Sequence, residues 1–375
     1  MQSDHVLLIG GGHAHVAVLA DWIKRGLPSK RATLLTPTQH LRYSGMVPGW
    51  IAGQYARDAG TVDLAALARR AGAELLLDKC AAIDPETRTV LTMQNGVASF
   101  DIASIDVGGV GQAARLLGDD PRLLDVRPID AFVDQLAKDI AQLRQSTGRP
   151  AQIAVIGGGA GGVELAFALR NCPGHEYQSN IEFITGDAGL LPGFSQNVVD
   201  MVGNELSRQG MGFLGANARI EGGVIRASRT TLQDIDIIVA AMGSGAPEWP
   251  GKGGLACDAD GFIAVDAHQC SISHPYIFAV GDVAARQDRE VPHSGVHAVM
   301  AGPILAQNLR AAAKGDIPTQ TYHPRSNSLY LIATGDGGAI ASYGRLCAKG
   351  RWVGRLKRWI DNRWISKYAR LARGG

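Results

Sequence analysis

The sequence predicts an α/β protein with two three-layer units, each built around a parallel sheet, and a C-terminal amphipathic helical segment. Two glycine-rich turns, at residues 10–15 and 157–162, each follow a short apolar strand and precede a helix-like run. A later apolar strand, 276–280, ends in Gly281 and Asp282. Strand, turn and helix alternate in this way in α/β folds. At 375 residues the chain has room for two or three domains.

The second turn has the more regular glycine pattern. Gly157, Gly159 and Gly162 fall on the G-x-G-x-x-G spacing. The first glycine permits a tight turn, the second lets a pyrophosphate approach the backbone, and the third lets helix and strand pack closely. The helix that follows offers free N–H groups and the positive end of its dipole. The pattern predicts a dinucleotide site, in which Ala160 and Gly161 also take part.

The first turn departs from this pattern. Gly10 and Gly12 fit it, but His15 stands at the third glycine position. A histidine there implies either looser packing of the helix on the strand or an imidazole aimed at phosphates. The alternative is that His13 and His15 merely occupy the first helical turn. The next strand ends at Thr36, where such units usually carry a ribose-binding acid.

Composition excludes several classes of protein. The five cysteines are widely scattered, with no C-x-x-C pair and no metal-type cluster, so we expect neither a disulfide framework nor a metal site. Dispersed thiols are typical of a reducing compartment. No segment has the pattern of a signal peptide or of a membrane-spanning helix. We therefore expect a cytoplasmic protein.

The segments between these motifs complete the predicted organisation. We expect a meander of short strands at Glu74–Leu77, 81–83, 89–93 and 98–102, and an amphipathic helix at 128–144. Two further strands end at Gly109 and Gly243, the first in a close backbone approach. We assign residues 1–115 and 255–325 to one discontinuous domain, 126–250 to a second domain, and 326–375 to the C-terminal segment.

The two glycine turns and the late Gly281-Asp282 strand tip together resemble the FAD- and NAD(P)-dependent pyridine nucleotide-disulfide oxidoreductase superfamily. The resemblance implies two Rossmann-like domains, with FAD on the first turn and NAD(P)H on the second. For FAD it implies contacts from the first turn, the strand tips and one loop proline: Gly10, Gly12, His13, Ala14, His15, Thr36, Pro48, Gly109, Gly281 and Asp282. For NAD(P)H it implies contacts from the second turn and its neighbours: Gly157, Gly159, Ala160, Gly161, Gly162, Glu164 and Gly243.

Three branches of this superfamily compete. Disulfide reductases carry a cysteine pair shortly after the first unit, but residues 24–79 contain no cysteine, and a thiol relay needs two thiols in contact. Sulfide:quinone oxidoreductases need cysteines beside the flavin, for which only Cys172 and Cys347 are candidates. The loop 43–53, Glu164 and the basic tail resemble the type II NADH dehydrogenase-like branch most.

A still closer resemblance involves four short segments. GGGHAHV, RYSGMVPGWIAG, IDVGG and WVGRLKRWIDNRW resemble the flavoprotein-like module that is sometimes fused ahead of selenide, water dikinase. This chain has no kinase portion. A link to selenium metabolism stays open at this point, with no residue that argues for it.

The resemblance implies an FAD-dependent NAD(P)H dehydrogenase, and three residues are candidates for catalysis. Glu164 is either a nicotinamide contact or a structural carboxylate at a helix N-terminus. His293 and His297 either supply a proton to the acceptor or merely begin a helix. They stand where type II enzymes carry glutamines, which leaves a quinone and other small molecules open as acceptor. The sequence does not distinguish NADH from NADPH, and a non-catalytic flavin- or nucleotide-binding sensor or scaffold is the alternative class.

The tail, residues 351–370, has a composition of its own. Eight basic residues and only one acid, Asp361, lie between residue 351 and residue 375, although the whole chain carries a net charge of +2. Trp352, Leu356, Ile360 and Trp364 recur every four residues. This pattern favours a helix lying on an anionic membrane surface. The alternatives are a helix docked on the protein itself or in a homodimer interface. We expect no nucleic-acid partner, since no second basic stripe exists.

Overall fold

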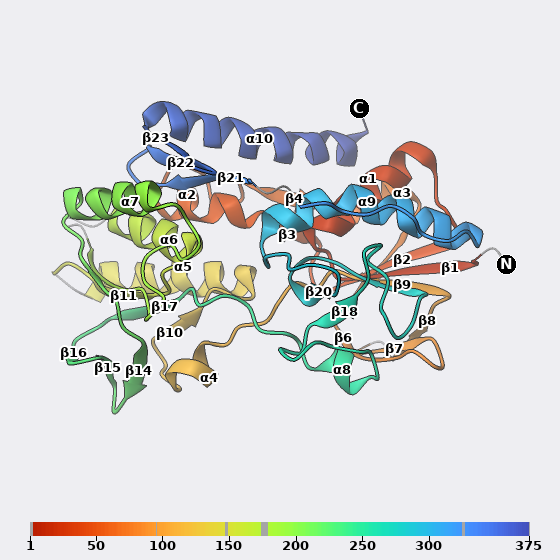
Figure 1. Ribbon diagram of the computed structural model, residues 1–375, viewed down its shortest axis with the longest axis horizontal. Helices are drawn as coiled ribbons and strands as arrows, with labels where there is room; N and C mark the ends of the chain where they lie inside the picture. Colours follow the sequence, from red (N-terminus) through yellow and green to blue (C-terminus); the bar gives the residue numbers. More distant parts are fainter. Residues whose placement is uncertain (1–2, 95, 147–148, 174–178, 325–326, 375) are drawn as a thin grey trace.

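Two five-stranded parallel sheets lie side by side in the computed structural model, which describes residues 3–94, 96–146, 149–173, 179–324 and 327–374 (Figure 1). The first sheet takes its strands from both ends of the chain. Its order is β19 (Ile277–Ala279), β9 (Ile102–Ile105), β1 (His5–Ile9), β2 (Arg31–Thr36) and β5 (Glu74–Leu77). The second sheet has the order β10 (Leu123–Asp125), β17 (Ile237–Ala240), β11 (Gln152–Ile156), β12 (Asn180–Ile184) and β13 (Phe213–Leu214).

Each sheet is covered by helices on one face and mainly by short strands on the other. Side chains alternate between the two faces of a strand, so each central strand contributes to both layers of packing. In β1, Val6 and Leu8 pack with the helices, and Leu7 and Ile9 pack on the opposite face. The helices on the first sheet are α1 (His13–Arg25), α3 (Leu64–Ala71) and α9 (Gly295–Lys314). Its other face is covered by β6 (Cys80–Asp84), β7 (Thr89–Thr92), β8 (Val97–Ser99), α8 (Trp249–Lys252), β18 (Ile263–Val265) and β20 (Ala284–Arg286).

The second sheet repeats this arrangement. Ile153 and Val155 face the helices, and Ala154 and Ile156 face the other layer. The helices are α5 (Ile129–Ser146), α6 (Ala160–Arg170) and α7 (Gln196–Arg208). The opposite layer consists of α4 (Ala113–Leu117) and the antiparallel sheet of β14 (Ala218–Glu221), β15 (Val224–Ala227) and β16 (Thr230–Leu232). The predicted α/β class with two Rossmann-like three-layer units is confirmed.

One strand prediction was wrong. Glu74–Leu77 is not part of the meander, since β5 pairs in parallel with β2 and forms the edge of the first sheet. Only β6, β7 and β8 form the antiparallel meander. Both kinds of strand are short apolar runs, and such a run does not reveal whether its partner lies beside it in sequence or across a helix.

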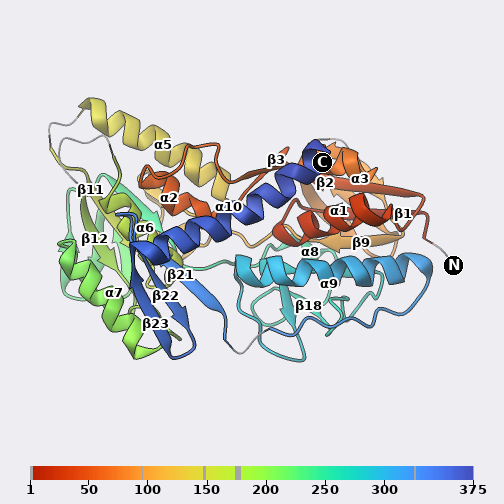
Figure 2. The same cartoon turned by 90° about the horizontal axis from the view of Figure 1, so that it is seen from above.

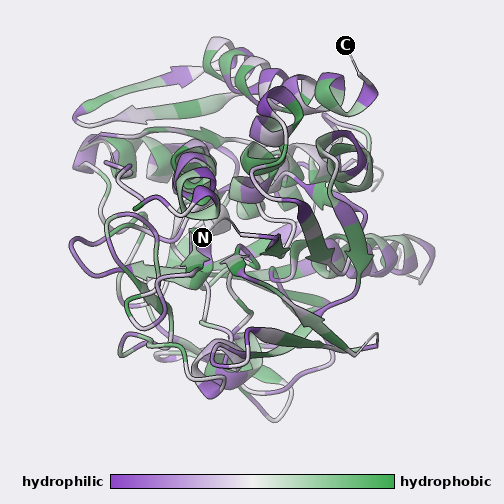
Figure 3. Ribbon diagram, turned by 90° about the vertical axis from the view of Figure 1, so that its right-hand side faces the viewer, coloured by the Kyte–Doolittle hydropathy of each residue, from purple (hydrophilic) through white to green (hydrophobic). Residues whose placement is uncertain are grey.

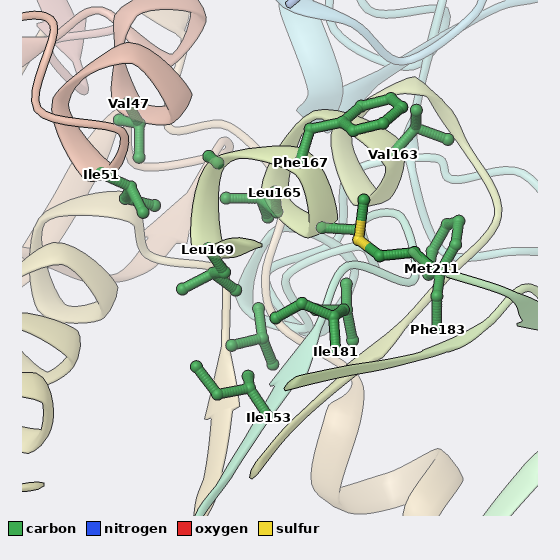
Figure 4. Packing of buried hydrophobic residues seen from close by; sticks show 14 of the residues in the cluster. Val47, Ile51, Ile153, Val163, Leu165, Phe167, Leu169, Ile181, Phe183 and Met211 are labelled. Atoms are coloured by element: carbon green, nitrogen blue, oxygen red, sulfur yellow. The ribbon is translucent and has the colours of Figure 1, made fainter. Parts of the chain in front are cut away.

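A loop of the first unit reaches over to the second unit. After β3 (His40–Arg42) the chain makes a one-turn 3-10 helix (Ser44–Met46) and α2 (Val47–Ile51), then returns through β4 (Thr61–Asp63). Figure 4 shows Val47 and Ile51 of α2 beside Leu165 and Leu169 of α6. All four side chains belong to one buried cluster. The loop 43–53 therefore packs on the helix that follows the second glycine turn.

The C-terminal segment contains an antiparallel sheet that the sequence patterns did not reveal. Its strands are β21 (Leu329–Ala333), β22 (Ala339–Tyr343) and β23 (Leu346–Gly350), and α10 (Arg351–Arg373) follows at once. Figure 2 shows α10 running from the side of the second sheet to α1 and α3 on the first. Hydrophilic and hydrophobic residues are interspersed along this helix (Figure 3). The tail thus joins the two halves of the molecule.

An ion cluster fastens the C-terminal sheet to α7. The side chain of Glu205 is 1% exposed and contacts Arg208 and, across the interface, Lys349 of β23. Gln209 donates to the same carboxylate at 2.7 Å and also to the carbonyl of Thr334, 2.9 Å away. Burial alone would raise the pKa of Glu205, but these donors outweigh it and lower the pKa to about 2.

We expect Glu205→Gln to remove an acid-sensitive part of the stability. A carboxyl whose pKa is lower in the folded than in the unfolded state stabilises the fold above the unfolded value, about 4.3, and this contribution is lost as the pH falls through about 2. Urea titrations at neutral and acidic pH should therefore show a smaller loss of stability on acidification in the variant. The control is Glu221→Gln, whose pair with Arg226 is exposed. Equal acid sensitivity of Glu205→Gln and the wild type would contradict this role.

Candidate functional site

The second glycine turn combines tightly packed glycines with two open ones. A Cβ on Gly157, whose φ is +129°, would lie 2.2 Å from the carbonyl oxygen of Ala241. A Cβ on Gly162 would lie 1.9 Å from the carbonyl oxygen of Gly157. Around Gly159, the N-cap of α6, and around Gly161, no atom lies within 4 Å of such a Cβ. The first and third glycines thus serve packing, and the turn presents an open face at the helix N-terminus, as a pyrophosphate requires.

The first turn packs on its strand in the same way at its start. A Cβ on Gly10, whose φ is +97°, would lie 2.3 Å from the carbonyl oxygen of Asp106. Asp106 follows β9 as Ala241 follows β17, and each donates its N–H to the last residue of the central strand. Gly10 and Gly157 are therefore equivalent, and so are Asp106 and Ala241.

In the first turn, His15 stands at the position that corresponds to Gly162 in the second turn. Its imidazole is fully buried, with Nδ1 2.6 Å from the carbonyl oxygen of Gly10 and Nε2 2.8 Å from the hydroxyl of Ser104. Burial lowers the pKa of His15 to about 4, so the ring is neutral, Nδ1 carries the proton and Ser104 donates to Nε2. The imidazole is turned into the protein and not toward the face where phosphates would lie, so the reading that aims it at phosphates was wrong.

Asp106 is a site residue that the motif analysis missed. Its Oδ2 accepts from the N–H groups of Ala14 at 2.8 Å and His15 at 2.9 Å, in the first turn of α1. The side chain is 3% exposed. Burial raises its pKa to about 7, against the lowering effect of those two N–H donors. The sequence contained one signal, namely an acid at the position that is Ala241 in the second unit.

Asp282 lies in the short 3-10 helix Gly281–Val283 and is 8% exposed. Its Oδ2 accepts from Nη2 of Arg127 at 2.7 Å. Arg127 lies on the connection between β10 and α5, so it reaches across from the second unit, and no motif pointed to it. Thr36 is buried at the end of β2. Gly109 and Gly243 lie on the two connections between the units; a Cβ on Gly109 would lie 2.3 Å from that of Ser244, whereas Gly243 is open.

Glu164 lies at the centre of a charged cluster between three elements. Its Oε1 accepts from the N–H of Ala333 in β21 at 2.9 Å and lies 3.6 Å from Nζ of Lys357 in α10. Nζ of Lys357 is also 3.4 Å from Oδ2 of Asp361 and donates to the carbonyl of Gly45 at 3.2 Å. Burial raises the pKa of both carboxyls, and Lys357 opposes this. The two carboxylates in turn raise the pKa of Lys357, although burial would lower it.

The two histidines occupy a different place from Glu164. The ring of His293 lies 4.0 Å from that of Phe262, and its Nε2 is 3.2 Å from the carbonyl oxygen of Ala284. His297 is buried, and its Nδ1 lies 2.8 Å from the hydroxyl of Tyr322. Both line a cavity of about 40 Å³ beside the start of α9, which has room for a few waters only. Burial lowers the pKa of His297.

A comparison with known protein families matches residues 4–302 to the model described as pyridine nucleotide-disulphide oxidoreductase. This match spans most of the chain. The chain belongs to the pyridine nucleotide-disulphide oxidoreductase family. The superfamily resemblance expected from the glycine turns is thereby confirmed.

One curated relative and two solved structures show how far the similarity of this chain to known proteins extends. Ferroptosis suppressor protein 1 of Taeniopygia guttata is 24% identical over 294 residues, which cover 74% of this chain and 72% of the relative. The sulfide:quinone oxidoreductase of Aquifex aeolicus is similar in structure, with a TM-score of 0.79, 18% identity, and 98% and 92% of the two chains covered. The NDH2 of Plasmodium falciparum, solved with NADH, has a TM-score of 0.77, 16% identity, and 96% and 97% coverage. At these identities the two structures establish the fold.

The family implies FAD and NAD(P)H as cofactors, and the second turn fits a dinucleotide as described above. For FAD, the elements around the first turn offer polar groups that have no partner within the protein. Among the side chains that the structure describes, Nε2 of His13, Oγ of Ser294 and Nε1 of Trp364 are buried without a hydrogen bond. The His13 ring lies 5.7 Å from that of Tyr43 and 5.5 Å from that of Trp364. Such orphaned groups fit a polar ring system like a flavin.

Pro48 and Tyr43 complete the surroundings of this place. Pro48 is buried in α2, and the rings of Tyr43 and Trp364 stack at 4.7 Å. Burial raises the pKa of Tyr43 to about 12, so its hydroxyl remains a donor. The C-terminal helix therefore supplies part of the wall next to the first turn.

The cysteines of this family member do not form a redox pair beside the first turn. Cys80 and Cys270 are buried, and burial raises the pKa of each thiol to about 12. Thiols with such pKa values stay protonated and react poorly. Cys172 lies just after α6, and Cys347 lies on β23. Cys80 and Cys270 are therefore unsuited to a thiol–disulfide relay.

Proposed function

We propose that the chain is an FAD-dependent NAD(P)H dehydrogenase that passes electrons to a small, quinone-like acceptor without redox cysteines. In this proposal residues 1–115 and 255–325 bind FAD, residues 126–250 bind NAD(P)H, and the segment 326–375 covers the place where the two sites meet. The main observation in support of this proposal is that Lys357 contacts residues beside both glycine turns. This one side chain joins Glu164, which follows the second glycine turn, to Gly45, in the loop beside the first.

The residues of this cluster are suited to hold a proton. Glu164, Asp361 and Lys357 bring two carboxyls and one ammonium into a buried place, and burial disfavours the extra negative charge. Burial therefore raises the pKa of both carboxyls, and this favours their protonated forms. Reduction of a quinone consumes protons as well as electrons, and Tyr43 extends the cluster toward the first turn. When bound, FAD supplies the acceptance of hydride and the release of electrons.

A different electron donor, sulfide in place of NAD(P)H, defines the alternative enzymatic function. Sulfide chemistry would require reactive thiols, and Cys172 and Cys347 are the cysteines nearest to α6 and the C-terminal sheet. We propose that His293 and His297 carry protons to the electron acceptor. A link to selenium metabolism has no residue in its favour, and a sensor or scaffold without turnover is the non-enzymatic alternative.

Steady-state oxidation of NADH and NADPH by the full-length protein tests this function. We expect turnover with ubiquinone or menaquinone analogues and none that depends on added sulfide. Reduction of the quinone analogue by sulfide, and not by NADH or NADPH, would favour the alternative branch. A coloured, flavin-containing protein without turnover with any acceptor would favour the sensor.

We also propose that the outer, solvent-exposed face of α10 binds an anionic membrane surface. The structure places Val353, Asp361 and Tyr368 against the protein, but Trp352 and Trp359 are 55% and 59% exposed. The exposed basic residues of the same helix are Arg351, Arg355, Arg363, Lys367, Arg370 and Arg373, of which Arg363 lies over the Trp359 ring. No helix among the described residues is long and apolar enough to cross a membrane.

Replacing both Trp352 and Trp359 with alanine should weaken vesicle binding by about tenfold or more, because the exposed rings supply the apolar contact. Flotation with phosphatidylserine-containing vesicles measures the bound fraction. Ile317→Ala is the control, since that side chain is 83% exposed and does not belong to α10. Unchanged flotation of the double variant, or no binding by the wild type, would contradict a membrane role for this face.

A further inference from the structure

The two glycine turns also differ at the residue that follows the neighbouring strand. Asp106 and Ala241 have the same backbone position, since each approaches the first glycine of its turn and donates its N–H to the central strand, at 2.8 Å and 2.7 Å. In the second unit a methyl group stands there. In the first unit a carboxyl group stands there instead, 3% exposed.

The carboxyl group of Asp106 uses the same donors that a dinucleotide turn offers to phosphates. It accepts from the N–H groups of Ala14 and His15 in the first turn of α1. It also lies directly beneath the turn, because a Cβ on Gly12 would be 2.3 Å from two of its atoms. A pyrophosphate above Gly12 would therefore share this helix N-terminus with the Asp106 side chain.

The groups around Asp106 do not neutralise it. On α1, burial lowers the pKa of His13 and of His15 to about 4, so both imidazoles are neutral at physiological pH. From the 3-10 helix after β19, Asp282 adds a second negative charge, which is paired with Arg127. His297 of α9 lies in the field of Asp282, and burial lowers its pKa too.

We propose that Asp106 sets the affinity of the first turn for the pyrophosphate of FAD, and that FAD binding couples to the uptake of one proton by this carboxyl group. Two anions at one buried helix N-terminus repel each other, whereas a protonated carboxyl is neutral and has a donor to offer. The proposal rests on the assignment of FAD to the first turn. The pKa of Asp106, raised by burial to about 7, places the transition in an accessible range.

The sign of the pH dependence follows from this coupling. Below about pH 7 Asp106 is protonated in the free protein, and FAD binds without a further proton. Above that pH a proton must be taken up, so the Kd for FAD should rise by up to about tenfold per pH unit. Asp106→Asn and Asp106→Ala should bind FAD with a nearly constant Kd, and more tightly than the wild type at alkaline pH.

The experiment titrates FAD into the full-length chain, freed of flavin, between about pH 6 and about pH 9, and follows FAD fluorescence. Calorimetry of the wild type in two buffers of different ionisation enthalpy counts the proton directly, and this readout does not depend on whether a variant folds. The matched control is Asp101→Asn. That carboxylate also accepts two backbone N–H groups, from Asp4 and His5, but it lies at the other end of the strands.

A reciprocal variant tests the same idea in the second unit. Ala241→Asp should weaken NADH binding and make it pH-dependent. A pH-independent Kd for FAD with no proton uptake in the wild type would overturn the role of Asp106 and leave the flavin assignment intact. Absence of FAD binding at every pH, in the wild type and in both Asp106 variants, would overturn the flavin assignment and this proposal with it.

Discussion

Lys357→Met should destabilise the protein by about 3–5 kcal/mol, because it leaves Glu164 and Asp361 buried without their shared cation. The helix α10 should then detach from the first turn of α6. Urea unfolding of the wild type and the variant measures this change, and NADH oxidation should fall together with stability.

The control for this prediction lies on the same helix. Arg355 is exposed on the outer face, so Arg355→Met should change the free energy of unfolding by less than about 0.5 kcal/mol. Adding Glu164→Gln to Lys357→Met should recover part of the loss, since one buried charge is removed. If Lys357→Met unfolds like Arg355→Met, the cluster does not hold the tail in place.

Gly162→Ala should raise the KM for NAD(P)H by about tenfold or more and destabilise the fold by about 1–3 kcal/mol. The new Cβ would lie 1.9 Å from the carbonyl oxygen of Gly157, which is backbone and cannot rotate away. The helix α6 must therefore move from its strand, and it displaces both the open turn and Glu164. Steady-state kinetics and thermal unfolding measure the two effects.

Gly203→Ala is the matched control for this prediction. Gly203 lies inside α7, and no atom lies within 4 Å of a Cβ at that position. An alanine there should be neutral or stabilise the helix by up to about 1 kcal/mol. An equally harmless Gly162→Ala would contradict the packing role of the third glycine.

The glycine turns could be predicted from the sequence because their geometry is local. A positive φ at Gly10 and Gly157 and the close packing of Gly162 each require a particular residue type at a fixed spacing. The strands around the turns also followed from short apolar runs. These features predicted the fold class and a dinucleotide site, and the family resemblance that they support implied FAD and NAD(P)H.

Other parts of the site depend on contacts between distant residues and gave no local signal. Arg127 reaches Asp282 across 155 positions, and Lys357 meets Glu164 only because the C-terminal sheet turns α10 back over both units. The sheet β21–β23 itself consists of short strands with no distinctive periodicity. Asp106 could have been noticed only by aligning the two units of the chain on each other.

The four-residue spacing of apolar residues in the tail does not place them all on one face of the helix. Four-residue steps advance about 40° around a helix beyond a full turn, so Trp352 and Trp364 end about 120° apart. Trp364 accordingly packs on Tyr43, and Trp352 is exposed. The stripe that the sequence presented as one apolar face is divided between the protein and the solvent, so α10 both docks on the body and retains an exposed aromatic, basic face.

The most direct measurement is an anaerobic titration of the purified full-length protein with NADH and NADPH, followed through the visible absorption of flavin. We expect a flavin spectrum that about one equivalent of nucleotide bleaches and that a quinone analogue then restores. A protein without flavin, or a flavin that neither nucleotide reduces, would contradict the proposed dehydrogenase.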